Sequence, residues 1–501
     1  MRLFLARQRG AAMRYASDFL WSTEGPGVRR DYLTIGALAF LSILTVGMLI
    51  RLWLNSLYPY PIDNGEGCIL GAAWHSACGK PIYGYVDAPP YHFNVYTPLL
   101  LYVGGLTMRL WGATPLPMRI LSSLFLIGAA AMIFLFVRRY TASWKAGLVA
   151  GLFLFVERHY FARAPYAVTD FPAIFFSLLG LYLWTGADKS KYWALAAFAL
   201  AFFSKQNAVI APAAALLALF LEGRRVQSLR LAGLYCAFLA AGFGVCYAVF
   251  GRAFFTDVLM YVGVADFKFG VGAQRVADTA MLCIAPFAAW VIYATVAWRD
   301  KRLLLPVLYT LFGFLSAFTN GRDGASRSYM FDFVAGLSIM LGLMWPAAMR
   351  RAKTARFVPP VLLIAAVQAV FIFAGFTHNF WRLCDKTRYD LRHDAALSTA
   401  YKTHSGMVFC CHQGFAPGAR AENLANDLFK LGQMVNAGVV SRDVFLKPIR
   451  NREFSMIIMD ERDSPRLLFT GYLREAVLKY YTVEHEEYGE LFLVPGRQGS
   501  S

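Results

Sequence analysis

The chain has few charged residues, and the acidic ones are fewer than the basic ones. Only 16% of its 501 residues are Asp, Glu, Lys or Arg, and 31 acids stand against 49 bases. Together with 58% hydrophobic residues, this excludes an ordinary soluble domain and is typical of a chain that crosses a bilayer repeatedly. The formal net charge of +18 does not indicate nucleic acid, because the bases fall in short clusters between apolar runs and form no basic groove with interleaved aromatics.

Other motifs that would direct function elsewhere are missing as well. The eight cysteines show no zinc-ligand spacing, no internal repeat is visible, and the C-terminal region has neither a glycine-rich phosphate loop nor a catalytic triad. The first apolar run lacks a small-residue cleavage site and follows about thirty polar and basic residues, which predicts a signal anchor. These absences argue against a zinc protein and against a carrier made of two repeated halves.

Long apolar runs give the architecture. Most of them approach the ~20 residues that a helix needs to cross the hydrocarbon, which predicts about eleven transmembrane helices. The candidate spans are residues 33–53, 119–137, 145–161, 171–187, 191–204, 207–221, 231–250, 278–298, 303–319, 328–348 and 357–376. The run 98–111 is shorter, begins with Thr97-Pro98 and carries Arg109, so it is a span or an interfacial helix.

Basic clusters decide that ambiguity and set the orientation. If 98–111 lies flat, roughly 21 Lys and Arg residues fall on one side of the membrane against roughly 11 on the other, so the first side is cytoplasmic. We therefore predict a multi-pass protein of the cytoplasmic membrane, with its N-terminal arm (1–32) inside. The transmembrane domain covers 33–376, with a first outer loop over 54–118 that contains interfacial helices.

Residues 377–501 differ from the rest in having dense, nearly balanced charge and an alternating pattern. We expect a small extracytoplasmic α/β domain here. Its expected elements are strands over 406–412 and 454–460, helices over 419–436 and 465–481, a short helix after Ser441, and a terminal strand or hairpin through 491–495.

Two acids stand at loop ends on the predicted outer face. Asp63 opens Asp63-Asn64-Gly65-Glu66 in the first outer loop, and Asp170 closes the stretch Tyr166–Asp170 after a later span. Carboxylates near membrane depth are costly and need a partner or a chemical task. The structural alternatives are that Asp63 caps a helix that begins near Asn64, with Glu66 in its first turn, and that Asp170 caps the next span.

Three further segments share that face. They are the aromatic-proline segment Tyr91-His92-Phe93-Asn94-Val95-Tyr96-Thr97-Pro98, the motif Ser204-Lys205-Gln206-Asn207 between spans, and the glycine-rich charged loop 320–329. Taken in order with the two acids and the sequence Tyr-Ala-Val-Thr-Asp-Phe-Pro at 166–172, the first two resemble motifs of the GT-C glycosyltransferases. The similarity is to the branch that contains the lipid A aminoarabinose transferase and the protein O-mannosyltransferases, and it covers most of residues 33–230.

The resemblance implies a membrane glycosyltransferase. Its donor would be a sugar on a polyprenyl phosphate, and its acceptor would be a hydroxyl of an envelope glycolipid, polysaccharide or protein, attacked with inversion. Asp63 is then expected to be the general base, and Asp170 to orient it, bind a sugar hydroxyl or hold a cation. Lys205 and Gln206 are expected to face the leaving phosphate.

Further substrate contacts are predicted from position. Arg163 is assigned to the phosphate because it lies seven residues before Asp170. The remaining candidates for substrate binding are Glu66, Tyr91, His92, Tyr96, Arg322 and Arg327. The alternatives are that Lys205 snorkels to the headgroups, that the aromatics form a membrane belt, and that the two loop arginines pair with Asp323 and headgroups.

The chain departs from the aminoarabinose transferases at one position that bears on metal binding. Where the aminoarabinose transferases have an acidic-basic pair before the proline of the aromatic segment, this chain has Tyr96-Thr97. We therefore predict no metal site, while a divalent metal remains the alternative. From other classes, a transporter or flippase and a membrane scaffold are the competing interpretations.

Overall fold

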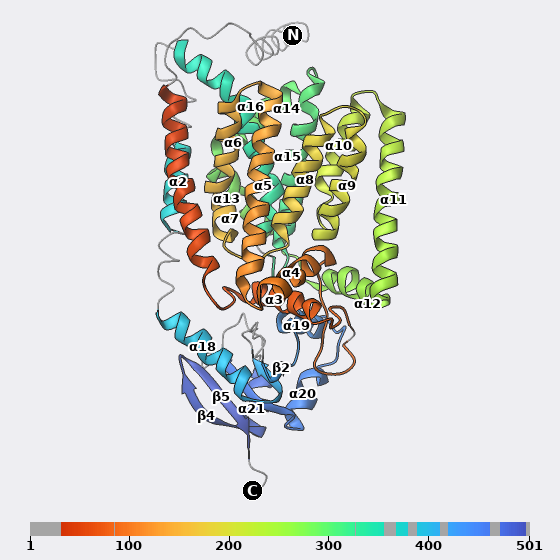
Figure 1. Ribbon diagram of the computed structural model, residues 1–501, viewed down its shortest axis with the longest axis vertical. Helices are drawn as coiled ribbons and strands as arrows, with labels where there is room; N and C mark the ends of the chain where they lie inside the picture. The colour runs from red at the N-terminus through yellow and green to blue at the C-terminus, as the bar shows by residue number, and fades with distance from the viewer. Residues whose placement is uncertain are drawn as a thin grey trace.

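The computed structural model describes residues 32–84, 86–325, 327–354, 367–378, 388–410, 419–460 and 471–496. Helices run side by side in an elongated bundle, and a small α/β domain lies at one end of it (Figure 1). The predicted N-terminal arm lies almost wholly outside the described residues, and Cys411 and His412 lie outside them too.

Within the described residues, five segments are long and apolar enough to cross a membrane. They are α2 (Tyr32–Ser56), α5 (Pro115–Thr141), α11 (Arg225–Phe250), Lys301–Gly321 around α15 (Leu304–Ala317), and Arg327–Arg351, which includes most of α16 (Phe331–Thr354). A bent pair, α13 (Phe269–Leu282) and α14 (Ile284–Val296), gives up to six. The predicted class of multi-pass helical protein is supported, whereas the count of about eleven crossings stays a prediction.

Shorter helices fill the bundle between these spans. Those of the bundle are α6 (Trp144–Val156), α7 (Arg158–Arg163), α8 (Asp170–Trp184), α9 (Ser190–Ser204), α10 (Ile210–Leu221) and the apolar helix Val367–His378. Short helices at the bundle ends are α12 (Arg252–Phe255), η1 (Thr256–Met260), η2 (Tyr261–Val264), η3 (Lys301–Leu303), η4 (Phe318–Gly321) and η5 (Arg327–Met330). The predicted spans fall on helices, but 145–161 covers both α6 and α7, 278–298 covers two helices, and only 367–376 of the last predicted span is described.

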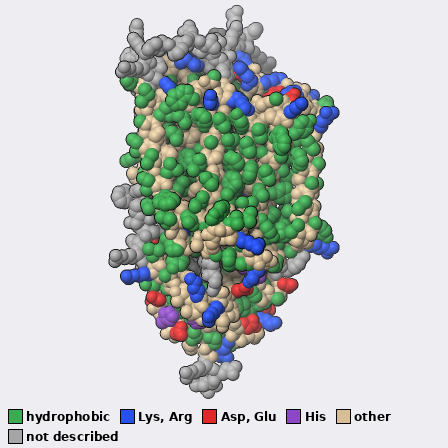
Figure 2. All heavy atoms as spheres, viewed as in Figure 1, with side chains coloured by type: hydrophobic (Ala, Val, Ile, Leu, Met, Phe, Trp, Pro, Cys, Tyr) green, Lys and Arg blue, Asp and Glu red, His purple; other side chains and the backbone are tan. Residues whose placement is uncertain are grey.

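The bundle surface is apolar around its middle. Figure 2 shows a broad band of hydrophobic side chains, basic side chains at the end away from the α/β domain, and side chains of both signs near that domain. On α11, Val245 and Val249 are each 63% exposed. Because such a band would be unfavourable in water, it fits contact with lipid.

The predicted span 278–298 is wrong as a single straight helix. Helices α13 and α14 meet at Cys283 and are bent by 97°. Pro286 lies in the first turn of α14. A proline inside a continuous helix would lack its hydrogen bond to residue 282 and clash with that carbonyl, so the helix restarts instead.

Two helices of the first long loop lie across the lower end of the bundle in Figure 1. They are α3 (Asn64–Ala77) and α4 (Pro98–Trp111). A Cβ at Gly105 would come within 2.7 Å of the Ala73 carbonyl oxygen, so glycine there permits the close packing of α4 on α3. The segment 98–111 therefore does not cross the bundle, as the charge pattern predicts.

The C-terminal region forms a five-stranded sheet with strand order β2-β1-β3-β5-β4. Strand β1 (Gly406–Cys410) pairs in parallel with β2 (Ala421–Asn423) and β3 (Phe454–Asp460), and β5 (Glu490–Pro495) is antiparallel to β3 and to β4 (Tyr481–Glu487). Its helices are α18 (Arg388–Thr403), α19 (Leu428–Asn436), α20 (Asp443–Arg450) and α21 (Gly471–Tyr480). The predicted helix 419–436 is wrong over its first part, where residues 421–423 form an edge strand.

The core of this α/β domain includes side chains from far away in the sequence. Tyr91 and Phe93 of the first long loop and Tyr261 of η2 are buried in it together with Phe409 and Phe454. The backbone of Tyr91 also exchanges hydrogen bonds with Leu424 and Asn426. The first long loop and the C-terminal domain are therefore packed as one unit beneath the bundle.

Candidate active site

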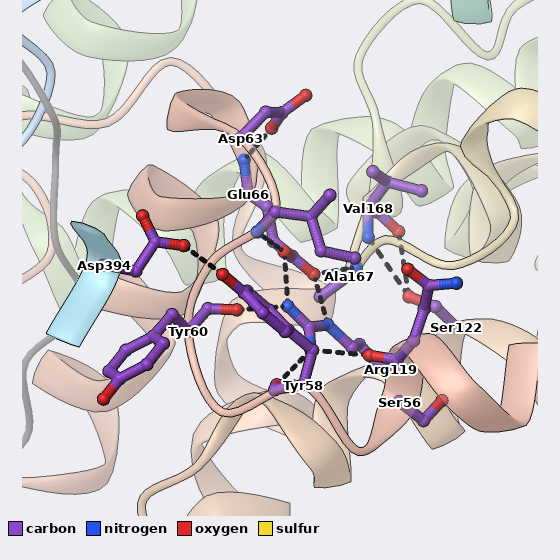
Figure 3. Close-up of polar contacts among 12 residues, drawn as sticks. Ser56, Tyr58, Tyr60, Asp63, Glu66, Arg119, Ser122, Ala167, Val168 and Asp394 are labelled. Carbon is purple, nitrogen blue, oxygen red and sulfur yellow. Dashed lines mark hydrogen bonds and ion pairs between the residues drawn. The ribbon is translucent and has the colours of Figure 1, made fainter. Parts of the chain in front are cut away.

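An entirely buried ion pair anchors the first long loop to the bundle. Arg119 of α5 donates through Nε and Nη2 to the two carboxylate oxygens of Glu66, at 2.8 Å each, and both side chains are 0% exposed. The same guanidinium donates to the carbonyls of Asn55, Tyr58 and Tyr60 (Figure 3). Buried charges are tolerated only when paired and hydrogen-bonded in this way.

The Glu66 carboxylate also holds the segment that leads to Asp170. It accepts hydrogen bonds from the backbone N–H of Ile62 at 2.6 Å and of Ala167 at 2.8 Å. The prediction that Glu66 binds substrate is not supported, because burial and these bonds leave neither oxygen accessible. Glu66 is instead a positioning residue for both acid-bearing segments.

Asp63 has a different environment although it is only three residues away. Its Oδ1 accepts the backbone N–H of Glu66 at 2.8 Å, which makes it the N-cap of α3. Its Oδ2 pairs with Nη1 of Arg163 at 2.6 Å, and its side chain is 37% exposed. In Figure 3 the Asp63 carboxylate is directed away from the Arg119 cluster. The capping alternative is thus correct, but it leaves this carboxylate within reach of solvent.

A second acid–base pair joins Asp170 and Lys205. Asp170 is the first residue of α8, and Lys205 directly follows α9. Their side chains form an ion pair and are 12% and 11% exposed. The ammonium also lies 3.4 Å from the Ser328 hydroxyl and 5.0 Å from the Tyr329 ring centre. Lys205 therefore does not extend to the headgroups, as the snorkelling alternative required.

Electrostatics keeps the Lys205 ammonium charged. Burial is the largest influence and by itself would lower the pKa of Lys205, but the charge and hydrogen bond of Asp170 together with Tyr329 outweigh it, and the pKa lies above its ordinary value. Arg163 is close enough to Asp170 and Lys205 for their charges to interact. Asp63 pairs with Arg163, Arg163 interacts with Asp170, and Asp170 pairs with Lys205; this sequence of interactions is called the row.

The aromatic segment connects this row to the α/β domain. Gln206 donates to the Val95 carbonyl at 2.7 Å, and the Thr97 hydroxyl donates to the Phe202 carbonyl at 3.3 Å. Tyr96 is close enough to Asp170 for its charge to affect the phenol. Burial, and to a smaller extent that charge, raises the pKa of Tyr96 well above its usual range. Of the three predicted contacts in this segment, Tyr96 lies nearest the row.

The structure places the remaining predicted residues in the α/β domain or in the loops around it. Tyr91 is buried in the α/β domain, and His92 lies beside Glu422 of β2. Arg322 forms an isolated β-bridge with Phe267, and the side chain of Arg327 is exposed. Asp323 pairs with Lys268 at 3.5 Å, and its predicted pairing with the loop arginines stays a prediction.

Sequence reasoning missed two buried acids near this end of the bundle. The Asp332 side chain accepts the Tyr309 hydroxyl at 3.0 Å and lies close enough to Lys205 for their charges to interact. The Asp257 side chain accepts the backbone N–H of Asn94 at 2.9 Å and of Gly84 at 3.3 Å. Both are isolated acids in apolar stretches, which is the signal that could have found them.

Metal ligands are not gathered at this site. Among the described residues, no group of three or more His, Cys, Asp or Glu side chains is arranged to hold a metal ion. Cys68 lies in the second turn of α3, and Cys78 directly follows the last residue of that helix. Ten residues of helix separate them by about 15 Å along the axis, which is too far for a disulfide.

Comparison with known proteins supports the predicted resemblance to a class, the GT-C membrane glycosyltransferases. A sequence model of the family described as dolichyl-phosphate-mannose-protein mannosyltransferase matches residues 95–250. That segment contains Arg163, Asp170 and Lys205. No match was found among curated proteins.

Solved structures of that class share the fold. ArnT from Cupriavidus metallidurans superposes with a TM-score of 0.60 at 16% identity in its apo state, over 91% of this chain and 99% of that one. The same protein bound to undecaprenyl phosphate gives 0.60 at 14% identity, over 92% and 99%. The archaeal oligosaccharyltransferase AglB from Archaeoglobus fulgidus, in complex with an inhibitory peptide and a dolichol-phosphate, gives 0.51 at 13% identity, over 95% and 75%. These findings confirm the predicted resemblance.

Proposed function

We propose that the protein transfers a sugar from a polyprenyl-phosphate donor to a hydroxyl of an envelope glycolipid, polysaccharide or protein, on the outer face of the cytoplasmic membrane. The observation that carries the proposal is the row of alternating charge beneath the bundle, in which an accessible carboxylate and a buried ammonium stand at opposite ends. Sugar transfer from a lipid phosphate needs a base at one end and a cation at the other. The matched family and the ArnT complex with undecaprenyl phosphate support this donor class.

Asp63 is the base in this proposal. The acceptor oxygen attacks the anomeric carbon while its proton passes to the Asp63 carboxylate, and the bond between that carbon and the phosphate oxygen breaks. The electron pair leaves with the polyprenyl phosphate. Of the carboxylates in the row, Asp63 has the greater exposure, which suits a group that must receive an acceptor from water.

Lys205 and Arg163 receive the leaving phosphate. Each is held by a carboxylate, Asp170 or Asp63, so the cations are oriented before the donor binds. Charge that develops on a phosphate in a poorly hydrated place is stabilised strongly by preorganised cations. Asp170 is a positioning residue for Lys205, and Tyr96, Ser328 and Tyr329 border the ammonium or its partner.

The experiment compares polyprenyl-phosphate lipids and envelope glycans by mass spectrometry in cells with wild-type protein or Asp63→Asn at equal membrane levels. We expect the variant to accumulate one polyprenyl-phosphate sugar and to lose a sugar from one glycan, which identifies donor and acceptor together. Unchanged profiles, with the protein still required for a phenotype, would favour a transporter or scaffold.

Two further measurements bear on the remaining parts of the proposal. Cysteine labelling should reach position 114 from outside and position 142 from inside, and the reverse would contradict the orientation. Transfer should persist after treatment with a chelator, since no metal is assigned, and a strong loss of activity would reverse that assignment.

A further inference from the structure

A cavity of about 180 Å³ lies between α3 and the edge strand β2 of the α/β domain. One face of α3 forms its floor with the small residues Gly67 and Gly71 and its side with Trp74 and His75. A Cβ at Gly71 would meet nothing within 4 Å. The volume is below the roughly 300 to 1,000 Å³ of pockets for drug-sized ligands, so it suits a single ring.

The polar groups of this cavity come from both sides. Glu422 of β2 pairs with Lys80 at 2.9 Å and lies 3.7 Å from His92. The rings of His75 and His92 meet at 4.9 Å between their centres. Among the described residues, Nδ1 of His92 is buried and has no hydrogen-bond partner. A buried polar atom without a partner is unfavourable, and a hydroxyl of a ligand would supply the missing hydrogen bond.

The cavity is close to neutral at physiological pH. Burial, and next the neighbouring His92 and Lys80, lower the pKa of His75 to about 4, and burial also lowers the pKa of His92. Both imidazoles are then uncharged, and the charges of Lys80 and Glu422 cancel. A lining with no net charge, made of a flat indole, two neutral imidazoles and the Lys80–Glu422 ion pair, suits the apolar face and the hydroxyls of a neutral sugar.

The position of the cavity indicates that it binds part of the acceptor and not the donor sugar. Gly71 follows Asp63 by eight residues on α3, or about 12 Å along the helix axis. The donor sugar must meet Asp63 while its lipid stays in the bilayer, whereas the cavity lies between α3 and the α/β domain. We propose that it binds a neutral sugar ring of the acceptor, away from the hydroxyl that is glycosylated. This inference rests on the proposed transfer reaction.

Binding is tested on the full-length protein in detergent by saturation-transfer difference NMR. The probes are methyl glycosides of neutral hexoses and N-acetylhexosamines, with methyl glucuronide and glucose 1-phosphate as anionic comparisons. We expect a neutral glycoside to bind wild-type protein in the millimolar range. Gly71→Phe, which fills the cavity, and Trp74→Ala, which removes the indole, should each weaken binding at least tenfold.

Gly233→Phe is the matched control, since Gly233 is a helical glycine of α11 with nothing within 4 Å of a Cβ. It should bind as the wild type does, and thermal unfolding should show that all variants are folded. Trp74→Ala introduces no larger side chain. If it also weakens binding, the loss in Gly71→Phe is not explained by misfolding. The proposal is overturned if no neutral glycoside binds, if only anionic probes bind, or if both cavity variants bind normally.

The acceptor assignment has its own readout. The glycoside that binds should compete with the endogenous acceptor for transfer in wild-type membranes, and absence of competition would overturn that assignment. Binding measured in Asp63→Asn separates this inference from the proposed function. Unchanged lipids and glycans in that variant count against sugar transfer, whereas missing glycoside binding counts against the cavity.

Discussion

Glu66 and Asp63 lie three residues apart, and each pairs with an arginine, but the two ion pairs differ in their exposure to solvent. Glu66 and Arg119 are fully buried, and every bond of the carboxylate goes to the protein itself. Asp63 and Arg163 are 37% and 21% exposed, and the Asp63 carboxylate is directed away from that cluster. An ion pair with no solvent-accessible atom has a structural role, because a substrate cannot reach it. A member of an accessible ion pair can instead bind a substrate in place of its partner. The contrast predicts that the two acids fail in different ways when changed.

Asp63→Asn should have the largest effect on catalysis. Asparagine caps helices as well as aspartate does, so α3 should persist, while loss of a general base lowers the rate about 100- to 10,000-fold. The measurement is sugar transfer per folded protein in membranes. Asp300→Asn is a matched control, because Asp300 also caps a helix and pairs with an arginine, Arg302. Equal activity of both variants would remove Asp63 from the mechanism.

Glu66→Gln should act on folding rather than on the chemical step. It leaves the Arg119 guanidinium buried without its countercharge, which costs about 3–5 kcal/mol. We expect a clear drop in Tm and in membrane level, measured in detergent, with a smaller loss of activity in the protein that remains folded.

Replacing both Glu66 and Arg119 tests whether their ion pair anchors the first long loop. Glu66→Met with Arg119→Met removes both charges but also leaves the Ala167 N–H and the carbonyls that Arg119 binds without partners. The double variant should therefore stay destabilised. A double variant as stable as the wild type would show that the pair is not an anchor.

The sequence predicted much of this site because the signals are local. Asp63, Asp170 and Lys205 each stand where a polar motif interrupts an apolar pattern, and the structure brings Asp170 and Lys205 together. The membrane limits where such residues can stand, so position along the chain carries information on depth. The same reasoning placed most of the helices, including the flat segment 98–111, but it missed the bend at Cys283 and the edge strand at 421–423.

Tertiary partners could not be predicted in the same way. Arg119 lies inside a predicted span, and nothing local distinguishes it from a residue that faces lipid or headgroups. Its pairing with Glu66 depends on how α3 folds back under α5. Likewise, Tyr91 was expected near substrate because it lies in an aromatic run, but its ring completes the core of the distant α/β domain.

Lys205→Gln tests the cationic end of the row and should reduce transfer about 100- to 1,000-fold, as removal of one preorganised donor to a developing anion does. The fall should be in kcat, with the affinity for donor changed less. Lys191→Gln is the matched control on the same helix, because Lys191 is also mostly buried and pairs with Asp188 at 3.1 Å, at the opposite end of α9. A similar loss in both variants would indicate a structural role for Lys205.

The smallest effect is expected at Asp257. This acid is buried like Glu66, but it has no cationic partner among the described residues. Burial raises its pKa to about 8, against the hydrogen bonds from Asn94 and Gly84 that favour the charged form. The folded protein therefore holds a proton that the unfolded chain releases near pH 4, and this contribution to stability falls as pH rises toward 8, by at most about 1.4 kcal/mol per pH unit. Asp257→Asn cannot titrate, so its Tm relative to wild type should rise between pH 5 and pH 8. A constant difference across that range would mean that Asp257 is already ionised in the folded protein, and that a buried carboxylate here survives on backbone hydrogen bonds alone.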